Sequence, residues 1–527
     1  MRVLCIILII VAAAGARRVD VVPANFGAKL TGAVAGDTLL LAAGTYGFAN
    51  MPSTQGTLSD PIVVMGVNKS TTIIYGCGYG SCEGFLFTGK HWIFENLTFQ
   101  GDGSNNHLFH VTGQAGGYIT WRNCHFSGVA DKAIKIDHSY YTGPQVVFPD
   151  YVLLENCSME LGGGGLMNND GSDFLTCRGN YTYGYVTGTG GPIYVYFTKG
   201  GNAYTVFENN VSSSGVNIFS FGGGTMYTPW TQWRHDEETW GATHTPKPGT
   251  SGNYGYKEVE TYRSICRNNI IIGASSSAFA SQAVIDCEFY NNTLINCATS
   301  LGKQFQNGRA TRLRFYNNLT INGGDDLMVA YDGFSDGIIC IAENNVALGT
   351  RTLSDIFVSV NTSNYSLSDW RLKSEAIATQ IGTGIAPYDH PTWPAYYSLL
   401  GPGNYDFHGV LRSTPPRIGA TQVTGVGIEE NAISASGAFL DVTPNPAHPT
   451  ANLRLSFVSD MPLVDILVCD IRGRHVRTLY YGPMDRGAHN VAWDGRDHSS
   501  RLLPAGTYFF RVSLGHDVRV KKFQWVH

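Results

Sequence analysis

The chain has 527 residues, of which 15% are charged and 12% aromatic, and it contains 63 glycines. This composition is more typical of a β-rich extracellular protein than of a helical cytosolic enzyme. The formal net charge of −5 argues against nucleic-acid binding, and no basic amphipathic helix points to a membrane surface. A chain of this length predicts two or more domains unless a repeat architecture absorbs it.

The first residues, 1–16, have the pattern of a secretory signal peptide. Arg2 supplies the positive charge, Val3–Ala13 is an apolar run too short to span a bilayer, and Ala14–Ala16 is a small-residue cleavage site. No later stretch approaches about 18 consecutive apolar residues. We therefore expect a secreted protein with no transmembrane segment after cleavage.

The next feature along the chain is an internal repeat, in which a short apolar strand is followed by an asparagine. Successive asparagines are mostly about 23 to 33 residues apart, which is one coil of a β-solenoid. The aligned segments are Trp92–Asn96, Ile119–Asn123, Val152–Asn156, Phe174–Asn180 with a one-residue slip, Thr205–Asn209, Ser264–Asn268, Glu288–Asn292, Arg314–Asn318 and Cys340–Asn344.

A coil of this kind cannot bury its apolar face alone, so it stacks on its neighbours through parallel strands. An asparagine at the same turn of every coil can hydrogen-bond to those above and below it, and it tolerates a left-handed backbone. Cys124 and Cys157 each follow an aligned asparagine. We expect these two thiols to stack as neighbours in the core.

The repeats resemble the pectate-lyase-like superfamily of right-handed parallel β-helices. Ala33–Tyr46 is similar to the segment that opens many members, and Tyr405–Ala420 is similar to their closing coil. The resemblance covers roughly residues 20–420 and implies an all-β, right-handed parallel β-helix. Because the superfamily includes lyases, hydrolases, epimerases and non-catalytic adhesins, the fold leaves the activity open.

Residues 421–442 are rich in small residues and are typical of a linker. The region 443–527 then predicts a small Ig-like β-sandwich, because short alternating strands follow one another closely. The expected strands are Leu453–Phe457, Val464–Asp470, Val476–Tyr480, His489–Trp493, Gly506–Leu514 and Val518–Trp525.

This C-terminal region resembles the FlgD-like Ig domain, which also occurs as the type A sorting domain of type IX secretion. The similarity lies in Asp470–Leu479, Trp493–Asp497, Pro504–Phe509 and the pair Lys521 and Lys522. It implies the secretion machinery as a partner and a protein that is extracellular, anchored at the bacterial cell surface. The alternative is an accessory sandwich without a sorting role.

One step of the repeat, from Asn209 to Asn268, is about twice the usual length, so either a coil has degenerated or a loop is inserted. The stretch 222–256 is not strand-like, and long non-repetitive loops are usually functional. Aromatic rings stack on sugar faces, which favours polysaccharide binding, although the same rings could pack against the coils. The candidate substrate-binding residues are Tyr227, Trp230, Trp233, His235 and Trp240.

Alignment of the coils also predicts a charged strip on one outer face, with Asp137, Asp170 and Lys199 at related positions. Such a strip suits β-elimination on a uronate polysaccharide, which needs a neutralised carboxylate and a base. The resemblance implies Lys or Arg as that base. The catalytic candidates are Lys199, Lys257, Arg234 and Arg263, and the candidate ligands for Ca²⁺ are Asp137, Asp170 and Glu258.

The favoured function is therefore a lyase-like enzyme that acts on acidic glycans. A glycoside hydrolase would use a carboxylate pair, for which Asp137 with Asp170 or Asp236 with Glu258 are the candidates. A non-catalytic β-helix adhesin or glycan-binding protein is the alternative from a different class. It predicts that these charges are dispersed over the surface, whereas the enzyme predicts that they converge in one groove.

Overall fold

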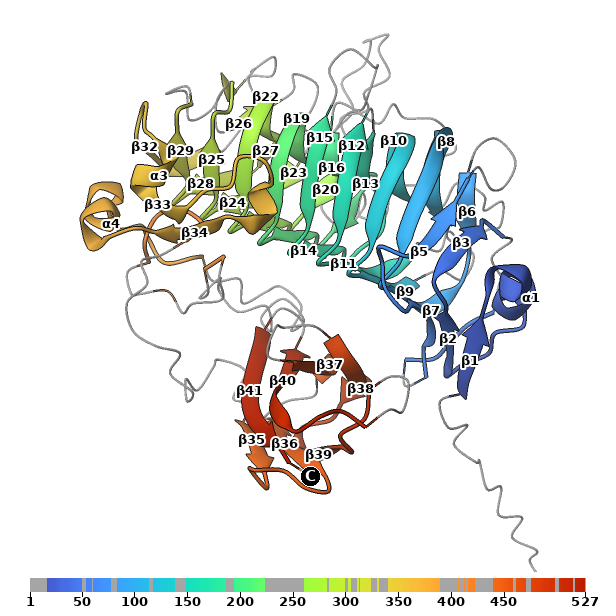
Figure 1. The fold of residues 1–527 in the computed structure, drawn as a ribbon. Coiled ribbons are helices and arrows are strands. Elements are labelled where there is room, and N and C mark those ends of the chain that lie inside the picture. The colour runs from blue at the N-terminus through green and yellow to red at the C-terminus, as the bar shows by residue number, and fades with distance from the viewer. Residues whose placement is uncertain are drawn as a thin grey trace, which may run out of the picture.

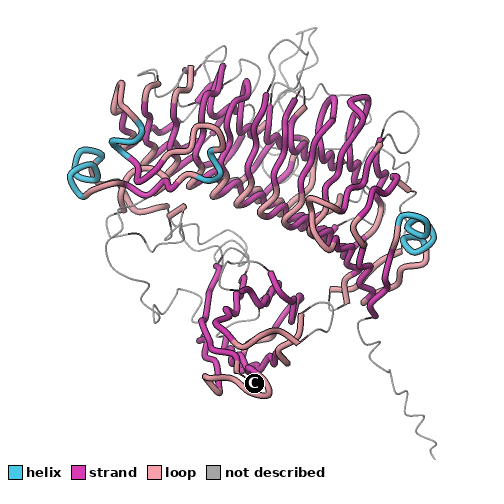
Figure 2. Tube along the Cα trace, viewed as in Figure 1, coloured by secondary structure: helices cyan, strands magenta, loops and turns pink. Residues whose placement is uncertain are grey.

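The structure is a computed structural model, and it consists of a long stack of parallel strands followed by a small antiparallel domain (Figures 1 and 2). The residues that it describes are 17–49, 54–58, 60–76, 83–112, 117–137, 148–162, 164–185, 194–222, 260–281, 284–298, 302–304, 310–311, 313–323, 329–330, 340–388, 406–407, 412, 416–421, 439–457, 461–470, 475–497, 502–514 and 517–526. The predicted signal peptide, 1–16, lies outside them.

Three parallel sheets form the stack, two of which run along most of its length, whereas the third is limited to four coils. The 12-stranded sheet contains, in order, β1 (Arg17–Val21), β2 (Asp37–Leu41), β4 (Ile62–Gly66), β7 (Lys90–Glu95), β9 (Gly117–Arg122), β11 (Asp150–Glu155), β14 (Thr176–Arg178), β18 (Val206–Glu208), β21 (Ile265–Arg267), β24 (Glu288–Tyr290), β28 (Leu313–Tyr316) and β31 (Cys340–Glu343).

The 16-stranded sheet contains β3 (Gly44–Gly47), β5 (Thr72–Tyr75), β8 (Thr98–Thr112), β10 (His125–Asp137), β12 (Ser158–Gly162), β15 (Tyr181–Tyr185), β19 (Val211–Phe221), β22 (Ile270–Ser281), β25 (Thr293–Ile295), β29 (Leu319–Ile321) and β32 (Val346–Ala347), with β6 (Glu83–Phe87), β13 (Gly165–Asp170), β16 (Tyr194–Lys199), β26 (Gly302–Gln304) and β30 (Val329–Ala330) beside that path. The four-stranded sheet contains β17 (Asn202–Ala203), β20 (Thr261–Tyr262), β23 (Val284–Ile285) and β27 (Ala310–Thr311).

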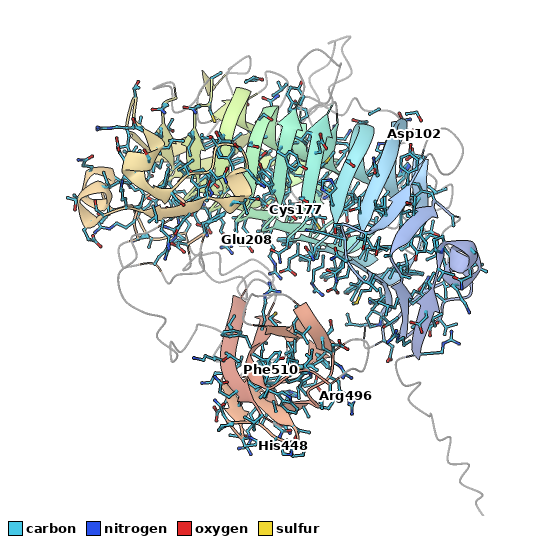
Figure 3. The ribbon with its side chains drawn as sticks, in the orientation of Figure 1. Asp102, Cys177, Glu208, His448, Arg496 and Phe510 are labelled. Carbon is cyan, nitrogen blue, oxygen red and sulfur yellow. The ribbon has the colours of Figure 1, made fainter. Side chains whose placement is uncertain are left out.

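Apolar side chains from successive coils fill the inside of the stack and form one continuous core. Phe94 stacks on Trp121 with ring centroids 6.0 Å apart, and Phe289 stacks on Phe315 at 4.9 Å. Cys177, labelled in Figure 3, is one of the buried thiols of this interior. The parallel β-helix expected from the repeat is confirmed, because each strand pairs with its equivalent in the next coil.

The asparagines occupy two neighbouring columns where the sequence alignment assumed one. Asn96, Asn123, Asn156, Asn209, Asn268 and Asn344 have positive φ and form the turn, as expected for the left-handed conformation. The hydrogen-bonded ladder lies one residue later and consists of Asn180, Asn210, Asn269, Asn292, Asn318 and Asn345. The alignment had therefore mixed members of both columns.

Earlier coils place Leu97, Cys124 and Cys157 in the ladder column instead of asparagine. The backbone N–H of Cys124 lies 3.4 Å from Sγ of Cys157, which confirms that these two residues stack. The backbone N–H of Cys157 in turn donates to Oδ1 of Asn180 at 2.9 Å. The ladder thus begins where the column changes from apolar or sulfur-containing side chains to amides.

Replacing Asn292 with leucine is expected to lower the free energy of unfolding by about 3 kcal/mol, because buried hydrogen-bonding groups lose their partners. Its Oδ1 accepts from the backbone N–H and side-chain amide of Asn269, and its own amide donates to Asn318 and to the carbonyl of Cys266. Urea denaturation measures the change. The exposed Asn490, replaced in the same way, should change stability by less than about 1 kcal/mol, and equal losses in the two variants would contradict the ladder's role.

The outer side of the 12-stranded sheet carries a second ladder, of alternating acidic and basic residues. Strand register aligns Glu95, Arg122, Glu155, Arg178, Glu208 and Arg267. Two arginines of the ladder contact Glu155: Arg122 Nε lies 3.2 Å and Arg178 Nε 2.8 Å from its carboxylate. Arg511 of the C-terminal domain reaches the same carboxylate at 2.6 Å. Figure 1 shows this domain beside the solenoid.

The double-length step of the repeat contains no additional rung. Strand β18 pairs directly with β21, and β19 pairs directly with β22, so the two sides of the step are adjacent coils. Of the two interpretations left open by the sequence, an inserted segment is therefore the correct one. Most of that segment, 223–259, lies outside the described residues.

Further elements precede and follow the stack. At the start, η1 (Pro23–Asn25) leads into α1 (Phe26–Thr31), which buries Phe26 and Leu30 against the first coils. After β32 the chain forms α3 (Leu353–Ile356), β33 (Phe357–Ser359), η2 (Tyr365–Leu367), β34 (Asp369–Leu372) and α4 (Glu375–Ile381).

The expected closing coil, Tyr405–Ala420, does not add a parallel rung within its described residues. It runs back along earlier coils instead: Arg412 bonds to Asn268 at 2.7 Å, and the backbone N–H of Ala420 donates to Thr293 at 2.9 Å. Burial lowers the pKa of Arg412 to about 10. Similarity of sequence had suggested another coil, but these hydrogen bonds fix the segment along the side of the stack.

The C-terminal domain is a sandwich of two antiparallel sheets. One sheet contains β35 (Phe439–Thr443), β36 (Ala451–Phe457) and β39 (Gly487–Trp493), and the other contains β38 (His475–Met484), β37 (Met461–Asp470), β40 (Gly506–Leu514) and β41 (Asp517–Trp525). All six expected strands are present, and β35 is an additional strand that begins inside the predicted linker. Trp493 and Phe510, the second of which is labelled in Figure 3, are both in the buried core of this domain.

Candidate functional site

A row of polar side chains crosses four adjacent strands of the 16-stranded sheet, β8, β10, β13 and β16. In β10, Ile134 and Ile136 point into the core, so Lys135 and Asp137 face outward. Parallel pairing then sets His110 beside Lys135 and Asp170 beside Lys199. The polar row, as we call it, consists of His110, Lys135, Asp137, Asp170 and Lys199.

Charged contacts connect the members of the polar row. The carboxylate of Asp137 lies 3.0 Å from Nε2 of His110 and 3.0 Å from Nζ of Lys135. The carboxylate of Asp170 lies 3.6 Å from Nζ of Lys199. Burial opposes the charge of Lys135, but Asp137 and Asp170 outweigh it and raise the pKa of that ammonium. The row therefore combines acidic and basic groups from adjacent coils.

Lys132 lies beside the row and extends across the neighbouring strand. Its side chain passes over Gly165 of β13, where an added Cβ would lie 2.9 Å from Cδ of Lys132. Burial, together with the positive charge of Lys199, lowers the pKa of Lys132, although Asp131 at 3.0 Å works in the opposite direction. Lys132 thus differs from Lys135, because its surroundings lower the pKa of the ammonium group whereas those of Lys135 raise it.

At one end of the row, Glu83 of β6 faces two histidines of β8. Its carboxylate lies 2.9 Å from Nδ1 of His107 and 3.5 Å from Nδ1 of His110. Nε2 of His107 lies 3.3 Å from Asp131. Burial would raise the pKa of Glu83, but the two histidines hold it at about 2. These residues were not predicted from the sequence, although the His-x-x-His spacing at 107 and 110 is a signal that could have indicated them.

Two glycines follow Lys199, and the first of them allows the side chain of Asp170 to approach the backbone closely. Gly200 and Gly201 both have φ of +77°, a conformation that glycine adopts at little cost. A Cβ at Gly200 would lie 2.1 Å from Oδ1 of Asp170. The Lys-Gly-Gly sequence therefore has a physical reason, because the carboxylate that pairs with Lys199 occupies the space of the missing side chain.

Replacing Gly200 with alanine is expected to displace the Asp170 carboxylate, because an added Cβ and Oδ1 of Asp170 cannot occupy the same space. The free energy of unfolding should fall by about 1–3 kcal/mol more than in a matched control, the usual cost of such overpacking. Gly103→Ala is that control: Gly103 also has a positive φ, +87°, but no atom lies within 4 Å of an added Cβ. Both variants carry the same type of backbone strain. Equal losses of stability in urea denaturation of the two variants would contradict a role for this close contact.

Three of the predicted site residues, Lys199, Asp137 and Asp170, come together in the polar row. Arg263 belongs to a different column. It follows a stack of turn residues, His91, Tyr118, Tyr151, Phe174 and Tyr204, whose neighbouring rings lie 4.5 to 5.0 Å apart. Its Nη1 donates to the hydroxyl of Tyr204 at 3.1 Å, and its guanidinium lies 4.4 Å from the ring centroid of Tyr262. These contacts assign Arg263 a packing position at the turn.

The remaining candidates fall in the segment 223–259, outside the described residues. They stay predictions from the sequence. They are Lys257, Arg234, Tyr227, Trp230, Trp233, His235, Trp240 and Glu258, together with Asp236 from the hydrolase alternative.

The described part of the expected Ca²⁺ site does not fit that ion well. Calcium prefers six to eight oxygen ligands, whereas Asp137 already contacts His110 and Lys135, and Asp170 already contacts Lys199. Three positive or protonatable groups thus occupy the surroundings in which a cation would sit. Calcium binding stays a prediction, and no chemical step below depends on it.

Several known proteins are similar to this chain. The polysaccharide-lyase structures include pectate lyase Pel9A, at 16% identity and a TM-score of 0.39 over 78% of this chain and 97% of that one. They also include an alginate lyase from Paenibacillus sp. str. FPU-7, at 12% identity and a TM-score of 0.34 over 56% of this chain and 98% of that one. None of the helices in the described part of the chain has the length and apolarity needed to cross a membrane.

A curated relative is the basal-body rod modification protein FlgD of Salmonella typhimurium, which is 26% identical over 142 residues, or 27% of this chain and 50% of the relative. The chain thus spans about half the length of the curated relatives that it matches. Residues 447–517 match the family model of the FlgD Ig-like domain. The protein therefore consists of a parallel β-solenoid followed by an FlgD Ig-like domain.

Proposed function

We propose that the protein is a secreted, surface-associated polysaccharide lyase that acts on acidic, uronate-containing glycans. The observation that carries the proposal is the polar row, in which Lys199 and Lys135 lie on one outer face of the solenoid with Asp137 and Asp170 between them. A row of strands spaced about 4.8 Å apart presents these charges along a line that suits a polymer.

Lys199 is proposed as the base of a β-elimination. Its Nζ, as the neutral amine, takes the proton from C5 of the uronate and becomes an ammonium group. The electron pair of that C–H bond forms the C4–C5 double bond, and the C4–O bond breaks while the leaving oxygen gains a proton from water. Lys135 neutralises the uronate carboxylate, which makes the C5 proton more acidic. Asp170, 3.6 Å from Nζ, positions the base.

Secretion and surface attachment form the second part of the proposal. The signal-peptide pattern of residues 1–16 supports export, and the FlgD Ig-like domain at 447–517 supports the interpretation of the C-terminus as a sorting domain read by secretion machinery. The contact between Arg511 and Glu155 ties this domain to the solenoid.

Ultraviolet absorbance of the unsaturated uronate product tests the lyase proposal. The full chain is incubated with alginate, pectate and glycosaminoglycans, with and without Ca²⁺. A rise in absorbance on at least one acidic glycan is the expected result. No rise on any substrate would reject the lyase.

A glycan-binding protein without catalysis is the second candidate, and one observation favours it. Both carboxylates of the polar row are already paired with lysines, as in a neutralised binding surface. Retained binding to an acidic glycan, without unsaturated product, would identify this function instead.

A further inference from the structure

We propose that Glu83, His107 and His110 bind a divalent transition-metal ion, with zinc as the best-fitting choice, at the end of the polar row. The three side chains come from two adjacent strands, since β6 pairs with β8 so that Glu83 lies opposite His107. Their ligand atoms all lie within 4.8 Å of one another. The site shares His110 with the polar row, but it uses neither Lys199 nor Lys135, the groups proposed to act on the uronate.

The distances suit a zinc ion. Bonds of about 2.0–2.2 Å from zinc to nitrogen or oxygen place neighbouring ligands roughly 3.3–3.6 Å apart in a tetrahedron. The Glu83 carboxylate lies 3.5 Å from Nδ1 of His110 and 2.9 Å from Nδ1 of His107. The ligand atoms of the two histidines lie within 4.8 Å of each other. Three ligand positions form when the second contact lengthens by a few tenths of an ångström and the two rings adjust to the same spacing, and water supplies the fourth.

The hydrogen-bonding capacity of the histidines points in the same direction. A neutral imidazole has one N–H donor, yet each of these rings has a carboxylate beside both nitrogens. His107 lies between Glu83 and Asp131, and His110 lies between Glu83 and Asp137. A metal ion on the Glu83 side satisfies both Nδ1 atoms and the shared carboxylate together, while each Nε2–H donates to its outer carboxylate.

This outer arrangement is the one that metal-bound histidines usually have. Carboxylates that accept from the second ring nitrogen fix the orientation of the ring and make it a better ligand. Here Asp137 lies 3.0 Å from Nε2 of His110, and Asp131 lies 3.3 Å from Nε2 of His107. Charge also favours a cation. The cluster and its surroundings contain three carboxylates, Glu83, Asp131 and Asp137, but only two lysines, Lys132 and Lys135, to balance them.

Ligand chemistry separates zinc from the hard cations. Two imidazole nitrogens with one carboxylate suit zinc and its neighbours in the first transition row, whereas calcium and magnesium take oxygen ligands. Both histidines are buried, with exposures of 7% and 2%. The ion would join β6, which pairs only with β8 among the described strands, to the body of the sheet.

The test is metal titration of the EDTA-treated full chain in competition with a chromophoric chelator. One equivalent of Zn²⁺ is expected to bind, and Co²⁺ in its place should give the visible absorption bands of a four- or five-coordinate site. His107→Gln and His110→Gln should weaken Zn²⁺ binding at least about 100-fold, and Asp131→Asn about 10- to 100-fold.

His125→Gln is the matched control, because His125 lies on the neighbouring strand β10 and bonds to Ser158, outside the cluster. It should bind Zn²⁺ as the wild type does. Asp131 is half-exposed, so its variant keeps the test valid even where a buried ligand variant fails to fold. Absence of stoichiometric Zn²⁺ binding in the wild type, or equal affinity in the wild type, His107→Gln and Asp131→Asn, would overturn the proposal. Neither result depends on whether the protein cleaves a glycan.

Discussion

Lys199→Met is expected to lower kcat on the preferred acidic glycan by about 10²–10⁴-fold, the usual contribution of a positioned base. Methionine keeps an unbranched apolar chain at the position but removes the amine. Lys199 is partly exposed and its one described ion pair is with Asp170, so the solenoid should fold normally without it. KM should change little, because the base acts mainly in the transition state.

Steady-state kinetics with Lys373→Met as the control separate this role from a general effect of charge. Lys373 lies after β34, exposed, with its ammonium bonded to the carbonyl of Ser354, far along the chain from the polar row. Its variant should match the wild type. A Lys199→Met protein that keeps the wild-type kcat would remove Lys199 from the chemistry.

Glu155→Gln is expected to lower the free energy of unfolding by about 3–5 kcal/mol, which is the typical cost of breaking a buried ion pair from one side. Glu155 is 1% exposed, and it contacts Arg122, Arg178 and Arg511 at 3.2, 2.8 and 2.6 Å. Glutamine fills the same volume but leaves these guanidinium groups without their shared negative charge. Urea denaturation of the full chain measures the loss.

The same carboxylate predicts a pH dependence. Burial alone would raise the pKa of Glu155, but Arg178, Arg511 and Arg122 together hold it well below the ordinary value. A lowered pKa in the folded state means that the contribution to stability is present above the unfolded value, about 4.3, and is lost as the pH falls below it. The Glu155→Gln variant should therefore lose less stability on acidification than the wild type.

Glu375→Gln is the control for the charge itself, since Glu375 is an exposed carboxylate that lies 3.3 Å from Arg417. Exposed pairs contribute only about 0–1 kcal/mol. If Glu155→Gln costs no more than this control, the buried alternating ladder is not a source of stability. Arg511→Met should show whether the domain contact matters, because it leaves Arg122 and Arg178 in place.

The sequence predicted the elements that a repeat imposes. The repeat period predicted where the strands of the solenoid lie. It also predicted that Asp137, Asp170 and Lys199 lie on adjacent strands although they are distant along the chain. The turn asparagines were also recognised, because a left-handed residue at each corner is a local requirement. The predicted position of the hydrogen-bonded ladder was one residue too early in several coils. Some coils have asparagine at both the turn and the ladder position, as at Asn291 and Asn292, so the sequence does not show which of the two columns forms the ladder.

The histidine cluster escaped prediction because the alternation of a strand fails there. His107 and His110 are three residues apart, which in a regular strand would place them on opposite faces. In β8 the strand bends, so that Leu108 and Phe109 both enter the core and both histidines remain outside. Register shifts in β10 between Ser127 and Lys132 belong to the same bend. Only coordinates show which side chains such a bend brings together.

Side-chain type alone did not predict the contacts that a residue makes. Arg263 was a reasonable partner for a uronate, but its position in the stack of turn residues depends on the rings of Tyr204 and Tyr262, which no local pattern indicates. The closing segment shows the same limit. Its similarity to a coil did not reveal that Arg412 would bond to Asn268, more than a hundred residues earlier in the chain.

A crystal structure of the Lys199→Met protein with an acidic oligosaccharide tests whether the polar row binds the substrate. The sugar chain is expected across β10, β13 and β16, with a uronate carboxylate in contact with Lys135 and a C5 atom facing position 199. An oligosaccharide bound elsewhere, on the sandwich or on the opposite side of the solenoid, with nothing along the polar row, would contradict this expectation.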